Sequence, residues 1–572
     1  MFLGSRSRLR AAVIAAAVGA GVLAAAIPAA AAPAAGTRSY LVITAPGDTA
    51  GAKTAVSSNG GTVWSSYDAI GVVVAHSGAA DFATRMRTVT GVQKVGATRT
   101  SDVPAEAANP PVPTSPSQAT PATGEPVRTD MSQIGADRAW AVNTGSSSVT
   151  VGVLDTGVDD QHADLAPNFD SANSASCAYG KLDTRTGSWR DTGSHGTHVA
   201  GTIAAAKNGR GMVGVAPGVK VASVRIAEKP SGLFFPENTI CAMVFSGDRG
   251  FEVTNNSYYT DPWLFNCPDN ADQDAILEGV KRAVAYAEGK GVLNVAAAGN
   301  ENYNLANKSS DSSSPNDSTP SSRTVTNACL SVPTEVSGVV SVASINSSNT
   351  KSSFSNFGTD KIHVAAPGDS VYSTIPGGRY TTMSGTSMAS PHVAGVAALL
   401  KSTNPTATPA QLRALLANQA DDLGCTDSRC SGTSAKNNFF GEGRVDAFAA
   451  VDTGTPPGGG AFENTTDVAI PDAGAAVTSS IAVTGVSGNA PATLKVDVNI
   501  VHTYRGDLVV DLIAPDGTAY RLKASNNDSA DNVVATYTVN ASSEVANGTW
   551  KLQVQDVARQ DTGYINSWKL TF

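Results

Sequence analysis

Short apolar runs separated by helical patterns dominate the middle of the chain. Six such runs recur, at residues 149–154, 219–226, 251–256, 292–298, 339–345 and 362–366. Continuous apolar strands that alternate with helices are typical of a parallel sheet covered on both faces. We therefore predict an α/β unit over residues 129–451, built on a doubly wound, mainly parallel sheet. Reactive groups collect past the carboxyl ends of such strands, which is where Asp155 and Asn300 lie.

The region before this unit has a different pattern. Strands are predicted at residues 40–43, 62–67, 70–76 and 92–97, with helices at 52–58 and 80–89, so residues 37–101 should form a small α+β unit. Sequence rich in Pro, Ala and Ser follows over residues 102–128, which predicts an exposed, cleavable linker. A small folded unit before a severable linker is typical of a prodomain.

Period-two alternation of apolar residues marks the C-terminal end. Three stretches show it, namely Leu494/Val496/Val498/Ile500, Trp550/Leu552/Val554 and Trp568/Leu570/Phe572. A Gly/Pro linker over residues 452–462 precedes them. Alternation with turn sequences between the runs predicts an antiparallel, all-β sandwich over residues 463–572.

The first 34 residues have the order of a secretory signal peptide. Arg6, Arg8 and Arg10 precede an apolar run over residues 11–27, and small residues follow. Glycine and proline break the run, which disfavours a membrane-spanning helix. We expect a secreted, extracellular protein with no membrane span after signal removal.

Composition adds limits on size and partners. The chain has 572 residues, 41% of them hydrophobic, which predicts a folded protein of several modules. A formal net charge of -9 makes nucleic acid an unexpected partner. Six cysteines in an exported chain indicate disulfides. Proximity suggests only the pair Cys425 and Cys430, and the pairing of the other four stays open.

Three sequence patches supply an acid, a base and a nucleophile. Asp155 lies in VLDTGV, His195 in SHGTHVAG and Ser387 in SGTSMASPH. A serine hydroxyl is a weak nucleophile at neutral pH, so an imidazole must take its proton and a carboxylate must hold that imidazole in one tautomer. Taken singly, each residue could be a helix cap, a strand-end cap or a surface histidine, but the three roles together predict catalysis.

Competing motif interpretations are weaker. Asp-Thr-Gly also occurs at Asp191, Asp452 and Asp561, but Asp191 and Asp561 lack the preceding apolar strand that an aspartic-protease dyad would suggest, and Asp452 opens a glycine linker. His195 and His198 lack the glutamate of a zinc-binding HExxH helix. We expect no catalytic metal and no organic cofactor.

The order Asp, His, Ser and the flanking residues resemble those of the subtilisin-like serine peptidases over residues 132–446. The resemblance implies that Ser387 is the nucleophile, His195 the general base and acid, and Asp155 the orienting carboxylate. It also implies that the amide of Asn300, in the segment AAGN, and the Ser387 backbone N–H face the oxyanion.

The same resemblance implies a structural calcium ion at the loop around residues 209–214. Its ligands would be the side chains of Asp164 and Asn208 with the backbone carbonyls of Ala206, Arg210 and Met212. Hard oxygen donors suit calcium. An ordinary Asn-Gly turn remains the alternative, and Glu125 could join only if processing leaves it attached.

The resemblance implies that an extended peptide substrate adds as a β-strand between two facing segments of this chain. The first segment contains Ser257, Tyr258 and Tyr259, and the second contains Ala297, Ala298 and Gly299. The pair Tyr258-Tyr259 replaces the commoner Leu-Gly, and an insertion over residues 302–328 lies where the far pocket wall is expected. An apolar or broad preference is favoured, whereas cleavage after paired basic residues would need acids such as Asp261 in the pocket.

Residues 39–100 resemble the inhibitory propeptides of this family, and the tail resembles the P domain of proprotein convertases. We therefore expect a monomeric, secreted serine endopeptidase that acts on proteins and peptides through an acyl-enzyme and is autoprocessed from a preproenzyme. Its own propeptide would be an intramolecular inhibitor. A catalytically silent scaffold that binds proteins, or a narrow dibasic-specific protease, are the alternatives.

Overall fold

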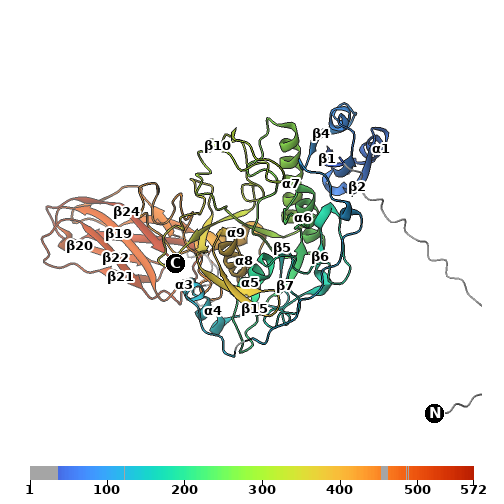
Figure 1. Cartoon of the computed structure of the whole chain (residues 1–572). Coiled ribbons are helices and arrows are strands. Elements are labelled where there is room, and N and C mark those ends of the chain that lie inside the picture. Colours follow the sequence, from blue (N-terminus) through green and yellow to red (C-terminus); the bar gives the residue numbers. More distant parts are fainter. Residues whose placement is uncertain (1–35, 122, 453–460, 485, 487–488) are drawn as a thin grey trace, which may run out of the picture.

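A seven-stranded parallel sheet forms the middle of the computed structural model, which describes residues 36–121, 123–452, 461–484, 486 and 489–572 (Figure 1). Its strands are β5 (Thr150–Asp155), β6 (Ala175–Ser176), β7 (Lys220–Arg225), β8 (Val253–Asn256), β9 (Leu293–Ala297), β12 (Val340–Ile345) and β13 (Val364–Pro367), in the spatial order β13-β12-β9-β8-β5-β7-β6. All six apolar runs form strands, so the predicted fold class is confirmed. The edge strand β6 was not predicted, because two residues are too few to show a pattern. The expected signal peptide and most of the second linker lie outside the described residues.

Helices cover both faces of this sheet. On one face α5 (His195–Ala204) and α8 (Thr386–Thr403) share an apolar cluster with Val153, and on the other α6 (Pro236–Arg249) and α7 (Ala271–Gly289) share one with Leu154. Neighbouring residues of one strand therefore enter different cores, as the pleat requires. The remaining elements of this body are α3 (Thr129–Gln133), α4 (Ala136–Val142), α9 (Pro409–Asn418) and the hairpins β10 (Ser310–Asp311)/β11 (Arg323–Thr324) and β14 (Val371–Ile375)/β15 (Arg379–Met383).

The N-terminal unit is an antiparallel sheet in the order β2-β3-β1-β4. Its elements are β1 (Arg38–Thr44), α1 (Ala50–Ser58), β2 (Gly61–Tyr67), β3 (Val72–Ser77), α2 (Phe82–Met86) and β4 (Val92–Ala97). Tyr40 and Val42 face its own helices, whereas Leu41 and Ile43 enter the cluster that contains α6 and α7. The open face of the small sheet is thus covered by the helices of the central body (Figure 1).

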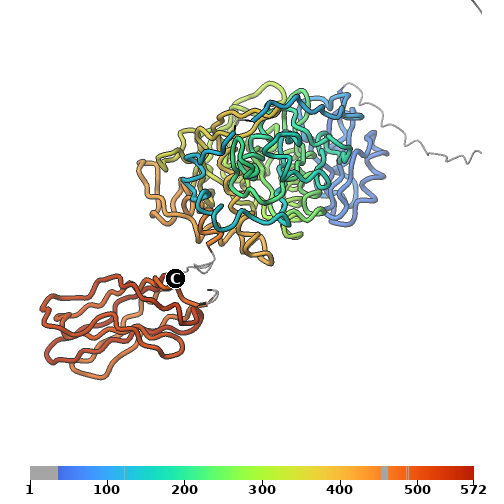
Figure 2. Tube along the Cα trace, turned by 90° about the horizontal axis from the view of Figure 1, so that it is seen from below, coloured from blue at the N-terminus to red at the C-terminus, as the bar shows by residue number. Residues whose placement is uncertain are grey.

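The tail is a sandwich of two antiparallel sheets. One contains β16 (Ala461–Asn464), β17 (Val468–Ile470), β19 (Leu494–His502), β22 (Val533–Val539) and β24 (Gly563–Thr571), and the other β18 (Val477–Val483), β20 (Leu508–Ile513), β21 (Ala519–Lys523) and β23 (Gly548–Asp556). Trp550 and Trp568 are fully buried between them, as the alternation predicted. Figure 2 shows this sandwich as a body of its own. Within the described part of the chain, no helix combines the length and apolar character needed to cross a membrane.

Candidate active site

Asp155 and His195 meet at the carboxyl end of the parallel sheet. Asp155 is the last residue of β5, and His195 is the first residue of α5. His195 Nδ1 lies 2.8 and 2.9 Å from the two carboxylate oxygens of Asp155, whose side chain is fully buried. A carboxylate can only accept here, so Nδ1 carries the proton and Nε2 presents a lone pair.

The close packing around this pair depends on Gly196. A Cβ at Gly196 would lie 2.1 Å from the carbonyl oxygen of Gly157, so a larger residue could not follow His195 without moving the strand end. Burial lowers the pKa of His195, but the Asp155 carboxylate raises the pKa further, and the net result is a raised pKa. The site therefore favours the imidazolium that forms when His195 takes a proton.

Ser387 lies in the first turn of α8, ahead of the apolar run 393–400. The helix already begins at Thr386. Pro391 has no N–H to donate to the carbonyl of residue 387, so that carbonyl needs another donor. Ser257 Oγ supplies it at 2.9 Å, and Ser387 Oγ in turn donates to the Ser257 carbonyl at 3.1 Å. The nucleophile candidate is thereby linked to the segment after β8.

Asn300 contacts Thr386, the residue before Ser387. Its Oδ1 accepts hydrogen bonds from the backbone N–H of Thr386 at 2.8 Å and from Thr386 Oγ1 at 2.9 Å. A backbone N–H can only donate, so the atom that faces Thr386 is the oxygen of the amide. The Nδ2 donor consequently points away from Thr386 and remains available to a ligand.

A cavity of about 290 Å³ adjoins these residues. Of the expected substrate-binding residues, Ser257, Tyr258, Tyr259, Ala297 and Gly299 line it together with Asn300 and Ser387. Ala298 instead packs in an apolar cluster with Ala343 and Ile345. Alternation along the strand end explains this difference, because neighbouring residues point to different sides.

The cavity is also lined by residues that sequence reasoning placed there only in part. They are Gly232, Leu233, Phe234, Asp261, Leu264, Glu301, Asn316 and Ser331. Asn316 belongs to the insertion 302–328 and donates hydrogen bonds to Asp261 Oδ1 and to the Tyr259 hydroxyl, at 2.7 and 2.9 Å. Burial raises the pKa of Asp261 to about 7, although the Phe234 N–H also donates to its carboxylate. The loop 232–234 carried no sequence signal beyond its glycine.

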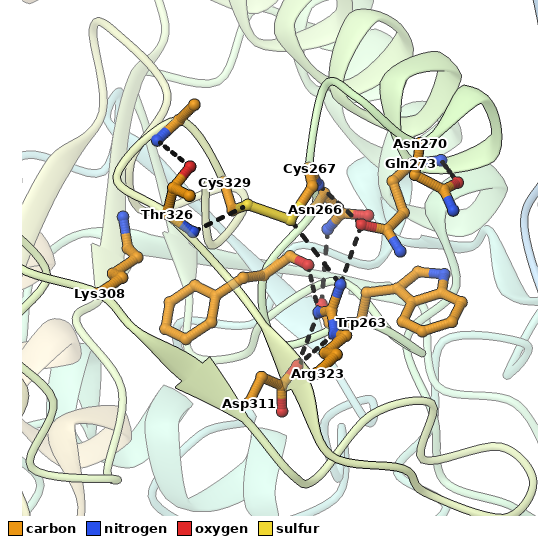
Figure 3. The surroundings of a disulfide bond; sticks show 12 residues. Trp263, Asn266, Cys267, Asn270, Gln273, Lys308, Asp311, Arg323, Thr326 and Cys329 are labelled. Atoms are coloured by element: carbon orange, nitrogen blue, oxygen red, sulfur yellow. Dashed lines mark hydrogen bonds and ion pairs between the residues drawn. A yellow bond between two sulfur atoms is a disulfide. The ribbon is translucent and has the colours of Figure 1, made fainter.

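The insertion is held in place by a disulfide and an arginine (Figure 3). Cys267 and Cys329 are joined, and Arg323 contacts the Asp311 carboxylate at 2.6 Å while its guanidinium lies over the Trp263 ring. Arg323 also donates to Gln273 Oε1 at 3.1 Å. The insertion is mostly polar, and it is therefore held by a disulfide, an ion pair and hydrogen bonds. The other pairs are Cys177–Cys241 and Cys425–Cys430.

The expected calcium loop surrounds one buried carboxylate. Asp164 is fully buried, and its Oδ2 accepts hydrogen bonds from the Tyr380 hydroxyl at 2.8 Å and from the Met212 N–H at 3.1 Å. Asn208 Nδ2 lies 3.3 Å from Asp164 Oδ1, and the Ala206 N–H donates to the Asp164 carbonyl. The Asp164 carboxylate is a hard oxygen donor of the kind that calcium prefers, and in this structure it accepts hydrogen bonds from three surrounding donors.

The remaining acid at this loop is Glu125. Its Oε1 accepts hydrogen bonds from the backbone N–H groups of Asn208 and Gly209, the latter at 2.7 Å. Over the residues that the structure describes, however, no cluster of three His, Cys, Asp or Glu side chains has metal-binding geometry. Any ion at this loop would therefore rely largely on backbone and amide oxygens.

Two family models match the chain. Residues 146–443, slightly more than half of it, match the model described as "Subtilase family", and residues 491–572 match "Proprotein convertase P-domain". Leupeptin-inactivating enzyme 1 of Streptomyces exfoliatus is 58% identical over 173 residues, which are 29% of this chain and 39% of the relative. The chain thus spans well under half of that relative's length.

A longer match and a solved structure extend this likeness. The extracellular basic protease of Dichelobacter nodosus is 31% identical over 502 residues, covering 76% of this chain and 75% of the relative. The crystal structure of the epidermin leader peptide processing serine protease of Staphylococcus aureus superposes with a TM-score of 0.58 at 20% identity. The match covers 73% of this chain and 98% of the chain of that structure, so the two proteins are alike in fold.

Proposed function

The chain belongs to the subtilase family and carries a C-terminal P domain of the proprotein-convertase type, and from this premise we propose that it is a secreted serine endopeptidase. The single observation that carries the proposal is the pairing of His195 Nδ1 with the buried Asp155 carboxylate, in a body where Ser387 lines a cavity at the start of α8. Acyl transfer requires such a base, held in one tautomer, together with a serine hydroxyl on which it acts.

In the proposed reaction Ser387 Oγ attacks the scissile carbonyl carbon while His195 Nε2 takes its proton. Asp155 stabilises the imidazolium that results, in agreement with the raised pKa of His195. The imidazolium then donates the proton to the leaving amine, which departs and leaves an acyl-enzyme. Water, activated by the same imidazole, hydrolyses the ester and restores Ser387.

The oxyanion of each tetrahedral intermediate would be held by Asn300 Nδ2 and the Ser387 backbone N–H. Support comes from the two hydrogen bonds that fix Asn300 Oδ1 on Thr386, because they orient the amide before substrate arrives. Donors fixed in advance stabilise developing charge without reorganisation cost.

We further propose that residues 37–101 are the inhibitory propeptide. Their sheet packs on α7, where Lys94 pairs with Asp274 at 2.8 Å and Arg87 with Asp272 at 3.1 Å. Autoprocessing would release this unit by cutting between it and residue 129. Calcium at the Asp164 loop would then stabilise the body by neutralising a buried carboxylate.

The cavity beside Ser387 supports an apolar or broad preference for the residue whose bond is cut. Tyr258, Phe234 and Leu264 supply apolar surface, whereas the Asp261 carboxylate is already engaged by Asn316 and the Phe234 N–H. A carboxylate with a pKa of about 7 and two internal donors is a poor anchor for a basic side chain.

Hydrolysis of a denatured protein by the secreted wild type and by Ser387→Ala tests the proposal. We expect the wild type to cut and to lose its N-terminal unit, and the variant to do neither. Equal hydrolysis by the two proteins would contradict the assignment, and an inert, unprocessed wild type would favour the binding-scaffold alternative.

A further inference from the structure

A buried guanidinium joins the N-terminal unit to the central body. Arg99 donates to both carboxylate oxygens of Glu228, at 2.9 and 2.8 Å, and to Glu237 Oε1 at 2.5 Å. Its guanidinium lies 3.7 Å from the centroid of the Phe235 ring. All three charged side chains are at most 2% exposed. Such fork-to-fork pairing on an aromatic face is specific for arginine rather than lysine.

The acceptors of this guanidinium are preorganised by the central body. Glu237 lies in the first turn of α6, where the helix N-terminus favours negative charge. Asn238 Nδ2 donates to Glu228 Oε1 at 3.1 Å and fixes its orientation. The acids and Phe235 therefore belong to the part of the chain that would remain after propeptide release, whereas Arg99 belongs to the part that would leave.

The fit to Arg99 is incomplete. Arg99 Nε and Glu237 Oε2 are buried, and neither has a hydrogen-bond partner among the described residues. An optimised permanent ion cluster would pair such atoms, because leaving them unpaired is costly. The pocket thus has an acceptor that Arg99 does not use.

This pocket adjoins the substrate cleft. The loop between Glu228 and Phe235 carries Gly232, Leu233 and Phe234, which line the cavity that Ser387 also lines. Ser101 Oγ and its N–H both contact Asp317, at 2.8 Å, next to the cavity residue Asn316. The propeptide segment 99–101 therefore contacts segments whose neighbouring residues line the cavity.

We propose that release of the propeptide converts the Glu228/Glu237/Phe235 pocket into a substrate subsite that selects an arginine side chain. The inference rests on the proposed endopeptidase function and names a substrate class for it: proteins with an arginine at one fixed distance from the scissile bond. Removal of Arg99 leaves two adjacent carboxylates that a substrate guanidinium satisfies in the same geometry. Arg99 then occupies in the precursor the place that substrate arginine takes in the mature enzyme.

The test uses the processed wild-type protein and a library of peptides in which arginine or glutamine is placed at each position around the cut. We expect one position at which arginine raises kcat/KM by about tenfold or more over glutamine, as expected for a desolvated guanidinium-carboxylate pair. This measurement needs no variant, so misfolding cannot obscure it.

Three variants then test whether Glu228 and Glu237 cause the arginine preference. Glu228→Gln and Glu237→Gln keep the side-chain shape and should lose most of the arginine preference, measured within each variant as the ratio of kcat/KM for the arginine peptide to kcat/KM for the glutamine peptide. Asp248→Asn lies on the same helix, at a side chain that accepts a hydrogen bond from the Tyr286 hydroxyl; it removes an equal charge and should keep the preference.

The outcomes separate the two proposals. Cleavage with no arginine preference at any position, or a preference that survives both glutamine variants, overturns the subsite and leaves the endopeptidase function standing. A wild type that cuts no peptide of the library overturns both.

Discussion

Acidification should loosen the N-terminal unit, because His76 is buried there in its neutral form. His76 lies on β3, is 7% exposed and stacks on Trp64 with the ring centroids 4.4 Å apart. Burial lowers the pKa of His76 from 6.5 to about 4, although Glu237 acts in the opposite direction. Trp64 Nε1 donates to the carbonyl of Tyr179 at 2.6 Å, so the stacked pair lies at the contact with the central body.

Proton binding gives the sign of the effect. In the unfolded unit His76 regains its usual pKa of 6.5, so between pH 6.5 and about 4 the unfolded form binds more protons and stability falls as the pH falls. A pKa difference of about 2.5, at about 1.4 kcal/mol for each pH unit, gives about 3.5 kcal/mol in full, of which about 3 kcal/mol is lost by pH 4. This contribution is complete above pH 6.5 and is lost below about pH 4.

Hydrogen exchange of the β3 amides in full-length Ser387→Ala, which cannot process itself, measures this contribution. After correction for intrinsic exchange, the opening free energy should be lower by about 3 kcal/mol at pH 4 than at pH 7.5. His76→Gln in the same background should show a much smaller pH dependence. An equal loss of protection in both proteins, or none in either, would refute the reasoning.

Three further predictions concern the catalytic residues and the calcium loop. Asn300→Ala should lower kcat by about 10²–10³-fold, the size known for removal of such a donor in a subtilisin, and Asn300→Asp, which keeps the acceptor for Thr386, should lower kcat as much. An effect confined to KM would contradict the role of Asn300 as an oxyanion donor. Burial lowers the pKa of His195, but Asp155 more than offsets this effect, so the pKa lies above 6.5. At pH values below that pKa, kcat/KM should rise about tenfold per pH unit, and above it kcat/KM should level off. A rate independent of pH from about 5 to 8 would count against a histidine base. Removing calcium should lower the free energy of unfolding by about 2.7 kcal/mol relative to a free calcium concentration a hundred times the Kd. The loss would be measured as a fall in the thermal midpoint, and Asp164→Asn should abolish that fall. An unchanged midpoint in the wild type would contradict a calcium ion at this loop.

Local patterns predicted the parallel strands well. Runs such as 149–154 and 339–345 place apolar residues on both faces of the strand because both faces of the sheet are covered, and this signal is contained in the run itself. The alternation around Trp550 and Trp568 likewise reports a sheet with one buried face. These signals need no knowledge of distant residues.

The features that sequence reasoning missed depend on long-range partners. The start of α8 at Thr386 lies in polar sequence, and Ser257 supplies the donor that Pro391 cannot. The cavity wall at Asn316 is held by a disulfide whose pairing the sequence left open. Arg99 meets Glu228 across 129 positions of sequence, and no periodicity records such a contact.

Covalent labelling with a fluorophosphonate tests the account most directly, because the probe reacts only with a serine whose hydroxyl is activated by a neighbouring base. The wild type, Ser387→Ala and His195→Ala would be treated at pH 8 and the labelled peptide identified by mass. The account predicts one adduct, on Ser387, in the wild type alone. An unlabelled wild type that is otherwise folded, or an adduct that persists in Ser387→Ala, would contradict it.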